Sequence, residues 1–342
     1  MEHSSITISG KTISKNELFL DSSLLSSELY PFLKDWFSKK EFICVKTSGS
    51  TGSPKTIKLS KKKMIASAIK TGNFLKLNPG DKALCCLPID YIAGKMMVVR
   101  SIVLGLDLTI AKPSKSPFSK LSSNYDFSAC TPHQLEGSTK NLSKIKILLI
   151  GGSSVNETLK KQLQDCKNTI YETFGMTETI SHIALKNITA NEQNFKALEG
   201  VSFESIEGCL KITCPDLLKN PLITNDLVEI FSEKEFSWIG RKDFVVNSGG
   251  IKLFPEKIER KLSKFLKDPF VVIGIPDESL GEKLVIVFEG KVSTDYQKAL
   301  ESLNKYEKPK RSFDFIKFKR LNNKVIRNEV LKKVLKINGS KQ

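Results

Sequence analysis

Histidine and closely spaced cysteines are scarce in this sequence, and each scarcity excludes a class of site. The 342 residues include three histidines and two tryptophans. The seven cysteines are scattered, and none forms the CxxC spacing typical of zinc cages and redox motifs. We therefore expect neither a disulfide framework nor a metal centre built on histidine.

Long hydrophobic runs are also absent. No apolar run approaches the roughly 18 residues that a membrane span needs, and the first 20 residues lack the apolar segment of a signal peptide. These features predict a cytoplasmic protein with no membrane span. The chain is 40% hydrophobic and 27% charged, with a mean hydropathy of −0.18, as in globular proteins with a sizeable core. Its length predicts about two domains.

Arginine is rare although the chain is strongly basic. The net charge is +17, which first suggests a nucleic-acid partner. However, only six of the 54 basic residues are arginine, the residue that nucleic-acid readers use for base and phosphate contacts. The lysines are spread along the chain and are densest near the C-terminus. We expect a solvated lysine-rich surface that suits a polyanionic substrate, and no nucleic-acid partner.

Short apolar segments alternate with longer helical segments between about residues 43 and 185. Strands are predicted at 43–45, 56–59, 83–87, 108–110, 127–130 and 146–150. Helices are predicted after an N-cap at Ser60, over 92–105, and after Pro132 and Val155. Strands that alternate with helices predict an α/β fold with a mainly parallel sheet covered on both faces.

The pattern changes near residue 208. Apolar segments at about 200–240 predict a smaller β element. Beyond Gly240 follow a strand, a Gly-Gly turn, a helix with Pro255 in its first turn, and further strands. This is the pattern of a compact α+β unit of about 100 residues. We predict a large domain over 1–240 and a small domain over 241–342.

The strongest chemical signal is TSGSTGSPKT, residues 47–56. Small residues let backbone amides approach an anion, hydroxyls donate to phosphate oxygens, and Lys55 adds a positive charge. A Walker loop is excluded because Pro54 occupies the second glycine position, and because the next residues alternate like a strand. The segment predicts a phosphate loop between two strands, with a plain Gly/Ser turn as the alternative.

Three further segments contain residue types suited to a nucleotide. In YETFGMTET (171–179), Phe174 can stack on a base, Thr177 can donate to a phosphate, and Glu178 can bind Mg²⁺. In TND (224–226), Asp226 can accept hydrogen bonds from both ribose hydroxyls. The fourth segment is GRKDFVVNSGGIKLFPEKIE, residues 240–259. The first of these segments is weak on its own, since aromatic residues near glycine usually serve packing.

Together and in this order, the four segments resemble the core motifs of the adenylate-forming superfamily of acyl-CoA ligases, peptide-synthetase adenylation domains and luciferases. The resemblance runs from about Thr47 to Arg327. NNKVIR (322–327) resembles the family's loop with a catalytic lysine, which would be Lys324, although Asn323 stands where the family usually has glycine. The resemblance implies a large domain shortened at its N-terminus, a mobile small domain, and an AMP-forming acid–thiol ligase that uses ATP, Mg²⁺ and coenzyme A.

The resemblance also implies a role for each matched residue. The ATP phosphates would be bound by Thr47, Ser48, Gly49, Ser50, Thr51, Gly52 and Lys55. The rest of the nucleotide would contact Gly151, Gly152, Ser153, Thr173, Phe174, Asp226 and Arg241. The catalytic residues would be Lys324, Thr177 and Glu178, of which Glu178 would bind the metal. Asp243 would be the hinge, and Ser248, Gly249 and Gly250 would face coenzyme A.

One branch of the superfamily is most similar. The segment LPIDYIAGKMMVVRSIVLG (87–105) resembles o-succinylbenzoate–CoA ligases of menaquinone biosynthesis, and the compact length agrees with that branch. It implies substrate contacts at Tyr91, which stands where many members have histidine, and at Gly94, Lys95 and Arg100. The acid has two carboxylates, and the one that does not react needs a cation to offset its desolvation. Lys95 or Arg100 can supply it, with surface or ion-paired positions as the alternative for both, and residues 96–99 are predicted to be core.

Two other interpretations stay open. The first is a ligase of the same chemistry that acts on a benzoate, a fatty acid, or an amino acid loaded on a carrier protein. The second is a basic nucleic-acid-binding protein on a degenerate ligase fold, against which the intact Lys55, Glu178 and Lys324 argue. A homodimer is also left open by the sequence.

Overall fold

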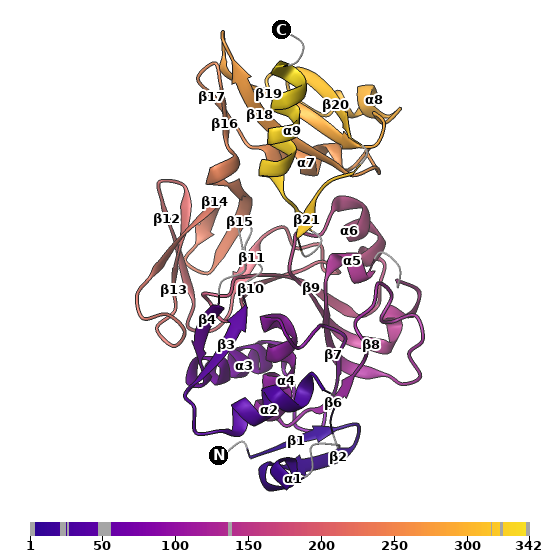
Figure 1. Cartoon of the computed structure of the whole chain (residues 1–342), viewed down its shortest axis with the longest axis vertical. Helices are drawn as coiled ribbons and strands as arrows, with labels where there is room; N and C mark the ends of the chain where they lie inside the picture. Colours follow the sequence, from indigo (N-terminus) through magenta and orange to yellow (C-terminus); the bar gives the residue numbers. More distant parts are fainter. Residues whose placement is uncertain are drawn as a thin grey trace.

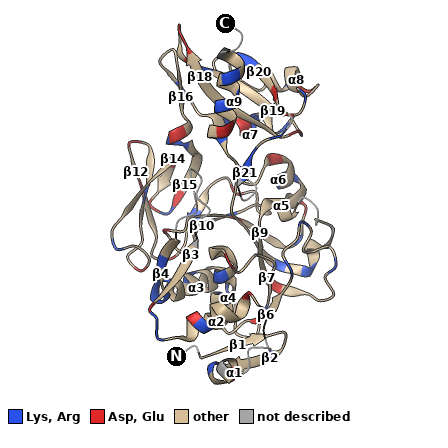
Figure 2. Cartoon of the chain, in the orientation of Figure 1, with Lys and Arg blue, Asp and Glu red and all other residues tan. Residues whose placement is uncertain are grey.

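The computed structural model of the chain describes residues 4–20, 25, 27–46, 56–135, 139–315, 317–321 and 324–339. Figure 1 shows a larger part, from indigo to orange, and a smaller part in orange and yellow. Helix α1 (Lys15–Leu20) lies at one end of the molecule and α9 (Arg327–Gly339) at the other. Lysine and arginine occur on both parts (Figure 2). No helix in the described ranges is long and apolar enough to cross a membrane.

The larger part is built on one sheet, in which thirteen strands of the described chain take part. Its parallel half has the order β9–β8–β7–β5–β6–β1, and β2 adds an antiparallel edge. The bounds are β1 (Ser5–Ile8), β2 (Lys11–Ser14), β5 (Lys82–Cys85), β6 (Asp107–Ile110), β7 (Tyr125–Cys130), β8 (Ile145–Ile150) and β9 (Thr169–Gly175). This half confirms the predicted α/β class, because parallel strands are joined through helices that cover the sheet.

The other half of the sheet is antiparallel. The bounds are β10 (His182–Asn187), β11 (Phe195–Ala197), β12 (Ser202–Ile206), β13 (Cys209–Thr213), β14 (Leu222–Ser232) and β15 (Glu235–Arg241). Strand β10 returns antiparallel to β9, and β11 pairs with β15. The predicted smaller β element is therefore present, but backbone hydrogen bonds join it to the parallel strands in the same sheet.

The larger part also contains helices, of which α3, α4, α5 and α6 follow the predicted positions and α2 and η2 were not predicted. The bounds are α2 (Leu29–Phe37), α3 (Lys61–Leu75), α4 (Ile92–Leu104), α5 (Pro132–Leu135), the 3₁₀ helix η2 (Thr139–Lys144) and α6 (Glu157–Gln164). The side chains of residues 96–99 are fully buried in α4, which confirms that they are core. Ser60 occupies the N-cap of α3, as predicted, but its side chain makes no capping hydrogen bond.

The smaller part has its own five-stranded sheet among the described residues. The bounds are β16 (Val246–Ser248), β17 (Ile251–Leu253), β18 (Phe270–Asp277), β19 (Gly281–Glu289), β20 (Arg311–Phe315), α7 (Pro255–Leu262) and α8 (Tyr296–Leu300). Gly249 and Gly250 have φ values of +59° and +80°, which the two-residue hairpin turn between β16 and β17 requires. The 3₁₀ turn η3 (Lys242–Phe244) connects the two sheets. The predicted domain boundary after residue 240 stays a prediction.

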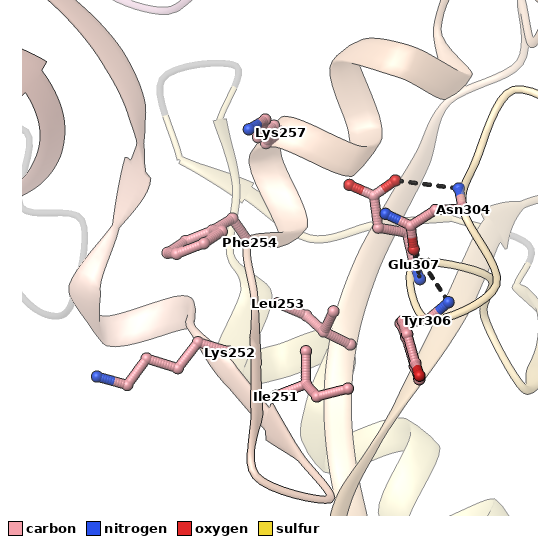
Figure 3. A pocket seen from close by; sticks show the side chains of 8 residues that line it. All are labelled: Ile251, Lys252, Leu253, Phe254, Lys257, Asn304, Tyr306 and Glu307. Carbon is pink, nitrogen blue, oxygen red and sulfur yellow. Dashed lines mark hydrogen bonds between the residues drawn. The ribbon is translucent and has the colours of Figure 1, made fainter.

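Two small features of this part bear on function. A pocket of about 190 Å³ lies beside β17 and the 304–307 segment (Figure 3). The first residue of its lining, Ile251, directly follows the Gly249–Gly250 turn in the chain. The second feature is the short hairpin of β21 (Arg320–Leu321) and β22 (Lys324–Val325), which in Figure 1 lies at the boundary between the two parts.

Candidate functional site

The predicted phosphate loop lies outside the described residues. This holds for Thr47, Ser48, Gly49, Ser50, Thr51, Gly52 and Lys55. The flanking strands β3 (Phe42–Lys46) and β4 (Thr56–Ser60) pair antiparallel along their whole length. The segment therefore connects two strands, as predicted, whereas a Walker loop leads from a strand into a helix.

Two predicted nucleotide segments meet at the carboxyl end of the parallel strands. Gly151 follows β8, and a Cβ atom at Gly151 would lie 2.6 Å from Thr173 Oγ1 on β9. Gly152 has φ +87°, a conformation that favours glycine. Both Gly152 and Ser153 are exposed. Ligands of open α/β sheets bind at this edge, so the structure brings these four predicted residues together where a nucleotide can reach them.

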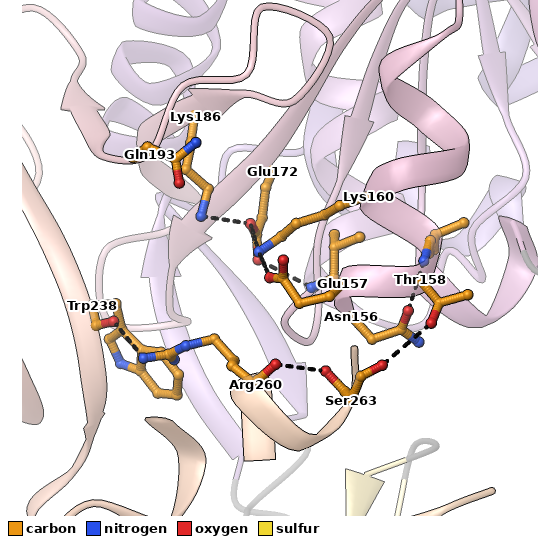
Figure 4. A network of polar contacts seen from close by, with 12 residues as sticks. Asn156, Glu157, Thr158, Lys160, Glu172, Lys186, Gln193, Trp238, Arg260 and Ser263 are labelled. Atoms are coloured by element: carbon orange, nitrogen blue, oxygen red, sulfur yellow. Dashed lines mark hydrogen bonds and ion pairs between the residues drawn. The ribbon is translucent and has the colours of Figure 1, made fainter. Parts of the chain in front are cut away.

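A buried carboxylate, which the sequence analysis missed, fastens the loop after β8 to β9. Glu172 is 4% exposed, and its Oε1 accepts a hydrogen bond from Val155 N–H at 3.0 Å. Its Oε2 lies 2.8 Å from Lys186 Nζ and 3.9 Å from Lys160 Nζ (Figure 4). Burial alone raises the pKa of the Glu172 carboxyl, but the two ammonium groups outweigh it and the net pKa is lowered.

The predicted adenine-stacking residue, Phe174, lies on the same strand. Its ring is half-buried, with its centroid 5.0 Å from that of Phe236 and 5.7 Å from that of Phe195. The ammonium group of Lys186 lies 4.4 Å from the Phe195 ring centroid. The adenine contact stays a prediction, and this aromatic cluster keeps the Phe174 ring in place.

The turn after β9 presents Thr177 and Glu178. Thr179, which is fully buried, accepts from Met176 N–H and has its Oγ1 2.8 Å from the Ser181 carbonyl oxygen. Ile180 has φ +68°, a strained value for a β-branched residue and one that is common near functional sites. Thr177 is half-buried and Glu178 is exposed. The turn is thus held rigidly while its two predicted catalytic side chains stay accessible.

Magnesium is the metal that the resemblance implies, and the exposed Glu178 is its predicted ligand. Glu178 forms no ion pair with any described residue, and an oxygen donor open to water suits a hard cation that keeps several water ligands. Within the described ranges, no group of three or more His, Cys, Asp or Glu side chains gathers around a metal site. A single carboxylate therefore fits a metal that the substrate phosphates also bind.

Arg100 is buried in α4 and meets neutral groups. It is 3% exposed, and its Nη2 donates to Ser181 Oγ at 2.7 Å and lies 3.5 Å from His182 Nδ1. Its Nε has no hydrogen-bond partner within the described chain. Burial lowers the pKa of Arg100 to about 10, so the guanidinium stays charged at neutral pH. No acidic side chain among the described residues pairs with this charge.

The partners of Arg100 form a buried polar chain that no sequence motif indicates. His182 Nε2 lies 3.0 Å from the Thr71 hydroxyl, which in turn donates to the Ser67 carbonyl. Burial, and then the charge of Arg100, lower the pKa of His182 well below its usual value. His182 is therefore neutral and cannot balance the guanidinium with a charge.

The other predicted acid-binding residues have contacts of a different kind. Lys95 Nζ donates to the Ile89 carbonyl at 2.8 Å and lies 5.1 Å from the Phe32 ring centroid. A Cβ atom at Gly94 would lie 2.2 Å from the Pro88 carbonyl oxygen, so packing alone requires glycine there. Tyr91 is 42% exposed at the N-cap of α4. Their substrate contacts stay predictions.

The predicted ribose and hinge residues lie together between β14 and β15. Asp226 and Arg241 are opposite each other in the two strands, with Arg241 Nη1 3.9 Å from Asp226 Oδ1. Arg241 Nη2 also lies 3.1 Å from Asp243 Oδ2. Asp226 is 6% exposed and accepts a hydrogen bond from Trp238 Nε1–H at 2.9 Å. Trp238 is a second residue that the sequence analysis missed.

The predicted residues of the smaller part stand on its hairpins. Ser248 is half-buried and the two glycines of the turn are exposed. The backbone of Lys324 lies in β22, and its side chain lies outside what the structure describes. Arg327, three residues later, contacts Glu259 with Nη2 at 2.5 Å and donates to the Val272 carbonyl. This pair anchors the end of the Lys324 hairpin on α7 and β18.

The described chain thus has a glycine loop after β8, a turn after β9 that presents Thr177 and Glu178, and a second, smaller sheet. Residues 33–203, half of the chain, match the family of AMP-binding enzymes. The chain belongs to this family, which confirms the predicted superfamily and, at the level of the family, the predicted class of AMP-forming ligase.

Several named proteins are similar to the chain over most of its length. A 2-succinylbenzoate–CoA ligase of Bacillus mycoides (strain KBAB4) is 24% identical over 82% of this chain and 68% of its own. A solved structure of an acyl-CoA synthetase (AMP-forming)/AMP-acid ligase II-like protein from Dyadobacter fermentans DSM 18053 is 32% identical, with a TM-score of 0.63 over 94% of this chain and 98% of its own.

A solved o-succinylbenzoate coenzyme A synthetase from Bacillus subtilis, in complex with ATP and magnesium ion, has a TM-score of 0.72 at 21% identity. It covers 84% of this chain, which spans 69% of that protein. At this identity the likeness shows the fold alone. The Dyadobacter protein, by contrast, has nearly the same extent as this chain.

Proposed function

We propose that this chain is an ATP-dependent acid–CoA ligase that converts o-succinylbenzoate, also named 2-succinylbenzoate, to its CoA thioester in menaquinone biosynthesis. Membership of the AMP-binding enzymes supports the ligase activity, and the names of the relatives given above support the choice of o-succinylbenzoate as the acid. The single observation that carries the choice of acid is the guanidinium of Arg100, which is 3% exposed and pairs with no carboxylate among the described residues.

Arg100 and this acid each supply what the other lacks. One carboxylate of o-succinylbenzoate reacts, and the other stays ionised and must be paired when it leaves water. Among the described residues, the buried guanidinium of Arg100 contacts the neutral Ser181 and His182, and its Nε–H has no hydrogen-bond partner. The ring carboxylate offers both a charge and an acceptor. A monocarboxylic acid would leave the guanidinium uncompensated, which argues for the diacid.

In the first half-reaction, an oxygen of the succinyl carboxylate attacks the α-phosphorus of ATP. The new O–P bond forms while the bond to pyrophosphate breaks, giving the acyl-adenylate. Both reactants are anions, so the chain's residues act by positioning and by charge neutralisation. The 47–55 loop holds the β- and γ-phosphates, and Thr177 and Lys324 face the α-phosphate and the carboxylate. Asp226 and Arg241 hold the ribose.

In the second half-reaction, the thiol of coenzyme A attacks the acyl carbonyl. The C–S bond forms, the C–O bond to AMP breaks, and the thiol proton is released. The substrates contain both nucleophiles, so no serine or cysteine of the chain is needed. The turn at Ser248, Gly249 and Gly250 faces the thiol in this scheme. Glu178 would hold Mg²⁺, which supplies positive charge to the phosphates when bound.

A screen of pyrophosphate release over carboxylic acids tests the activity and the acid together. We expect release with o-succinylbenzoate and little with benzoates, fatty acids or amino acids. Thermal shift gives a second measure, because an acyl-adenylate that is bound tightly raises the melting temperature. Release with a fatty or amino acid, and none with o-succinylbenzoate, would contradict the proposed acid but keep the ligase chemistry.

Replacing Arg100 with leucine tests the substrate contact directly. An ion pair with the ring carboxylate implies a loss of about 2–5 kcal/mol in kcat/KM for o-succinylbenzoate. The loss is expected to be much smaller for 4-oxo-4-phenylbutanoate, which lacks the ring carboxylate, and KM for ATP should barely change. Arg100→Lys keeps the charge and serves as the matched variant. If both acids lose activity alike while the melting temperature falls, Arg100 is structural.

A further inference from the structure

Trp238 contacts both parts of the molecule and takes no part in the chemistry described above. It lies on β15 of the large sheet, and its indole N–H donates to Asp226 Oδ1 at 2.9 Å. The guanidinium carbon of Arg260, from α7 of the smaller part, lies 5.1 Å from the centroid of its ring. The indole therefore stands between the predicted ribose carboxylate and the smaller part.

Arg260 is docked on this one short segment. Its Nη2 donates to the Ile239 carbonyl at 2.9 Å and to the Trp238 carbonyl at 3.2 Å (Figure 4). Arg260 forms no ion pair within 4 Å among the residues that the structure describes. Two carbonyls and a π-face thus bind the guanidinium, and this arrangement also restrains the rotamer of the indole on which it stacks.

The carboxylate of Asp226 is oriented by the indole. The Thr224 hydroxyl accepts from the Asp226 backbone N–H at 3.0 Å, which fixes the backbone but not the carboxylate plane. The terminal torsion of aspartate is broad, so the plane depends on side-chain donors. The Trp238 donor, at 2.9 Å, is nearer than Arg241 Nη1, at 3.9 Å.

We propose that Trp238 is a positioning residue that couples the docking of α7 to the ribose site. Arg260 holds the indole ring, and the indole N–H holds the Asp226 carboxylate in the orientation that accepts the ribose hydroxyls. This inference rests on the proposed function in one respect, because it takes Asp226 as the ribose ligand.

The preference for a complete ribose is the property to measure. Isothermal titration with Mg²⁺ and the full chain gives Kd for ATP, for 2′-deoxy-ATP and for 3′-deoxy-ATP, without need of any acid. A hydroxyl that donates to the charged Asp226 carboxylate is missing from one or other deoxynucleotide. We therefore expect the wild-type chain to bind ATP about tenfold more tightly than the deoxynucleotide that lacks this hydroxyl. A ratio of affinities is unaffected by a change that weakens the binding of all three nucleotides equally.

Two variants test the two sides of the indole. Trp238→Phe keeps a ring for Arg260 but removes the N–H donor, and Arg260→Met keeps the aliphatic stem but removes the guanidinium. We expect the ribose preference to fall to about twofold in both, because each loses one contact that orients the carboxylate. A residue that only supports the fold would lower the affinity for all three nucleotides and leave the ratio unchanged.

The chain offers a matched control for each variant. Trp36 is the other tryptophan, buried in α2 beside Phe32, and Trp36→Phe should keep the wild-type preference. Arg311 stacks on Phe313 at 4.7 Å within the smaller part, and Arg311→Met should keep it too. In the Trp36→Phe chain, Trp238 is the only tryptophan. ATP should change the fluorescence emission of Trp238 more than the more weakly bound deoxynucleotide does.

The outcomes separate this inference from the proposed function. If either Trp238→Phe or Arg260→Met keeps the wild-type preference, the coupling is overturned while the ligase assignment stands. Unchanged Trp238 emission on addition of ATP overturns it as well, and this measurement leaves Trp238 itself intact. A wild-type chain that binds all three nucleotides alike removes Asp226 from the ribose and overturns the inference. A chain that binds no ATP overturns both proposals.

Discussion

At the scale of single residues, Arg327 and Arg320 differ from Arg100 in the charge of their partners. Arg327 pairs with Glu259 at 2.5 Å, and Arg320 pairs with Glu289. Arg100 is more deeply buried than either and has only neutral partners among the described residues. A cation that is buried without a carboxylate is costly unless an anion arrives. The missing partner is therefore a stronger sign of a ligand than the arginine itself.

His182 makes the stability of the fold depend on pH. Its folded-state pKa lies well below 6.5, because burial and then Arg100 disfavour the charged ring. Below pH 6.5 the unfolded chain binds a proton that the folded chain refuses, so stability falls as pH falls, by up to about 1.4 kcal/mol per pH unit. His182→Gln should remove this part of the slope in urea unfolding between pH 6.5 and 5. His133→Gln is the control, and equal slopes in all three chains would contradict the prediction.

Lys324 should matter in one half-reaction only. It is proposed to stabilise charge between the carboxylate and the α-phosphate, so Lys324→Ala should slow adenylation by roughly 10²–10³. Thioester formation from acyl-adenylate supplied ready-made should be nearly unchanged. Pyrophosphate release and thioester formation are measured separately. Lys332→Ala, on α9, is the control. Equal losses in both steps would remove Lys324 from this role.

At the scale of elements, β9 is held in place by contacts from β10, from α6 and its preceding loop, and from the glycine after β8. Glu172 bonds to the loop before α6, pairs with Lys186 of β10, and lies near Lys160 of α6. Thr173, on the opposite face of the strand, lies against Gly151. The loop after β8 and strand β9, which both carry predicted nucleotide contacts, are thereby fixed to one another before any ligand binds. This lowers the entropy cost of ordering them on binding.

Removing the charge of Glu172 should destabilise the protein. Glu172→Gln keeps the shape but leaves the Lys186 ammonium buried without its counter-charge, and breaking such a pair costs roughly 3–5 kcal/mol. The free energy of urea unfolding measures it. Glu204→Gln is the control, because Glu204 is exposed in its pair with Lys211 and such a surface pair is worth about 1 kcal/mol at most. Glu172→Gln combined with Lys186→Met should recover much of the loss. A single variant as stable as the control would show that the pair contributes little.

At the scale of the whole molecule, two sheets with separate cores meet through a few polar contacts. Arg260 docks on β15, and Thr158 Oγ1 of α6 lies 3.4 Å from the Ser263 carbonyl oxygen (Figure 4). Between the two sheets runs η3, where Asp243 contacts both Asn225 and Arg241. Polar contacts of this kind are typical of interfaces between parts that move.

Asp243→Pro should separate the two half-reactions if residue 243 is the hinge. Proline fixes φ near −65°, which holds one setting of the backbone. If that setting is the adenylating one, acyl-adenylate accumulates and transfer to coenzyme A stalls. Asp243→Ala is the matched control, because it also removes the carboxylate that contacts Arg241 and Asn225 but leaves φ free. Wild-type turnover of Asp243→Pro would place the hinge elsewhere.

The local features of this protein could be predicted from neighbouring residues in the chain. Apolar periodicity is a property of neighbouring residues, so it predicted the strands around 83–87, 127–130 and 146–150 and the helix at 92–105, all of which are present. Motif chemistry is also local, and the four nucleotide-type segments sufficed to identify the superfamily. The two strands that flank the predicted phosphate loop could be predicted because the residues after Lys55 alternate between apolar and polar.

Features that depend on residues far apart in the chain could be seen only in the folded protein. The predicted smaller β element joins the parallel sheet because β11 pairs with β15, and periodicity cannot choose a strand's partner. The neutral surroundings of Arg100 come from a turn 81 residues away. The sequence motifs assigned no role to Glu172 or Trp238. Folding places Val155 and Lys186 beside Glu172. It places Asp226 and Arg260 beside Trp238. The role of a buried polar group depends on such partners, which only folding supplies.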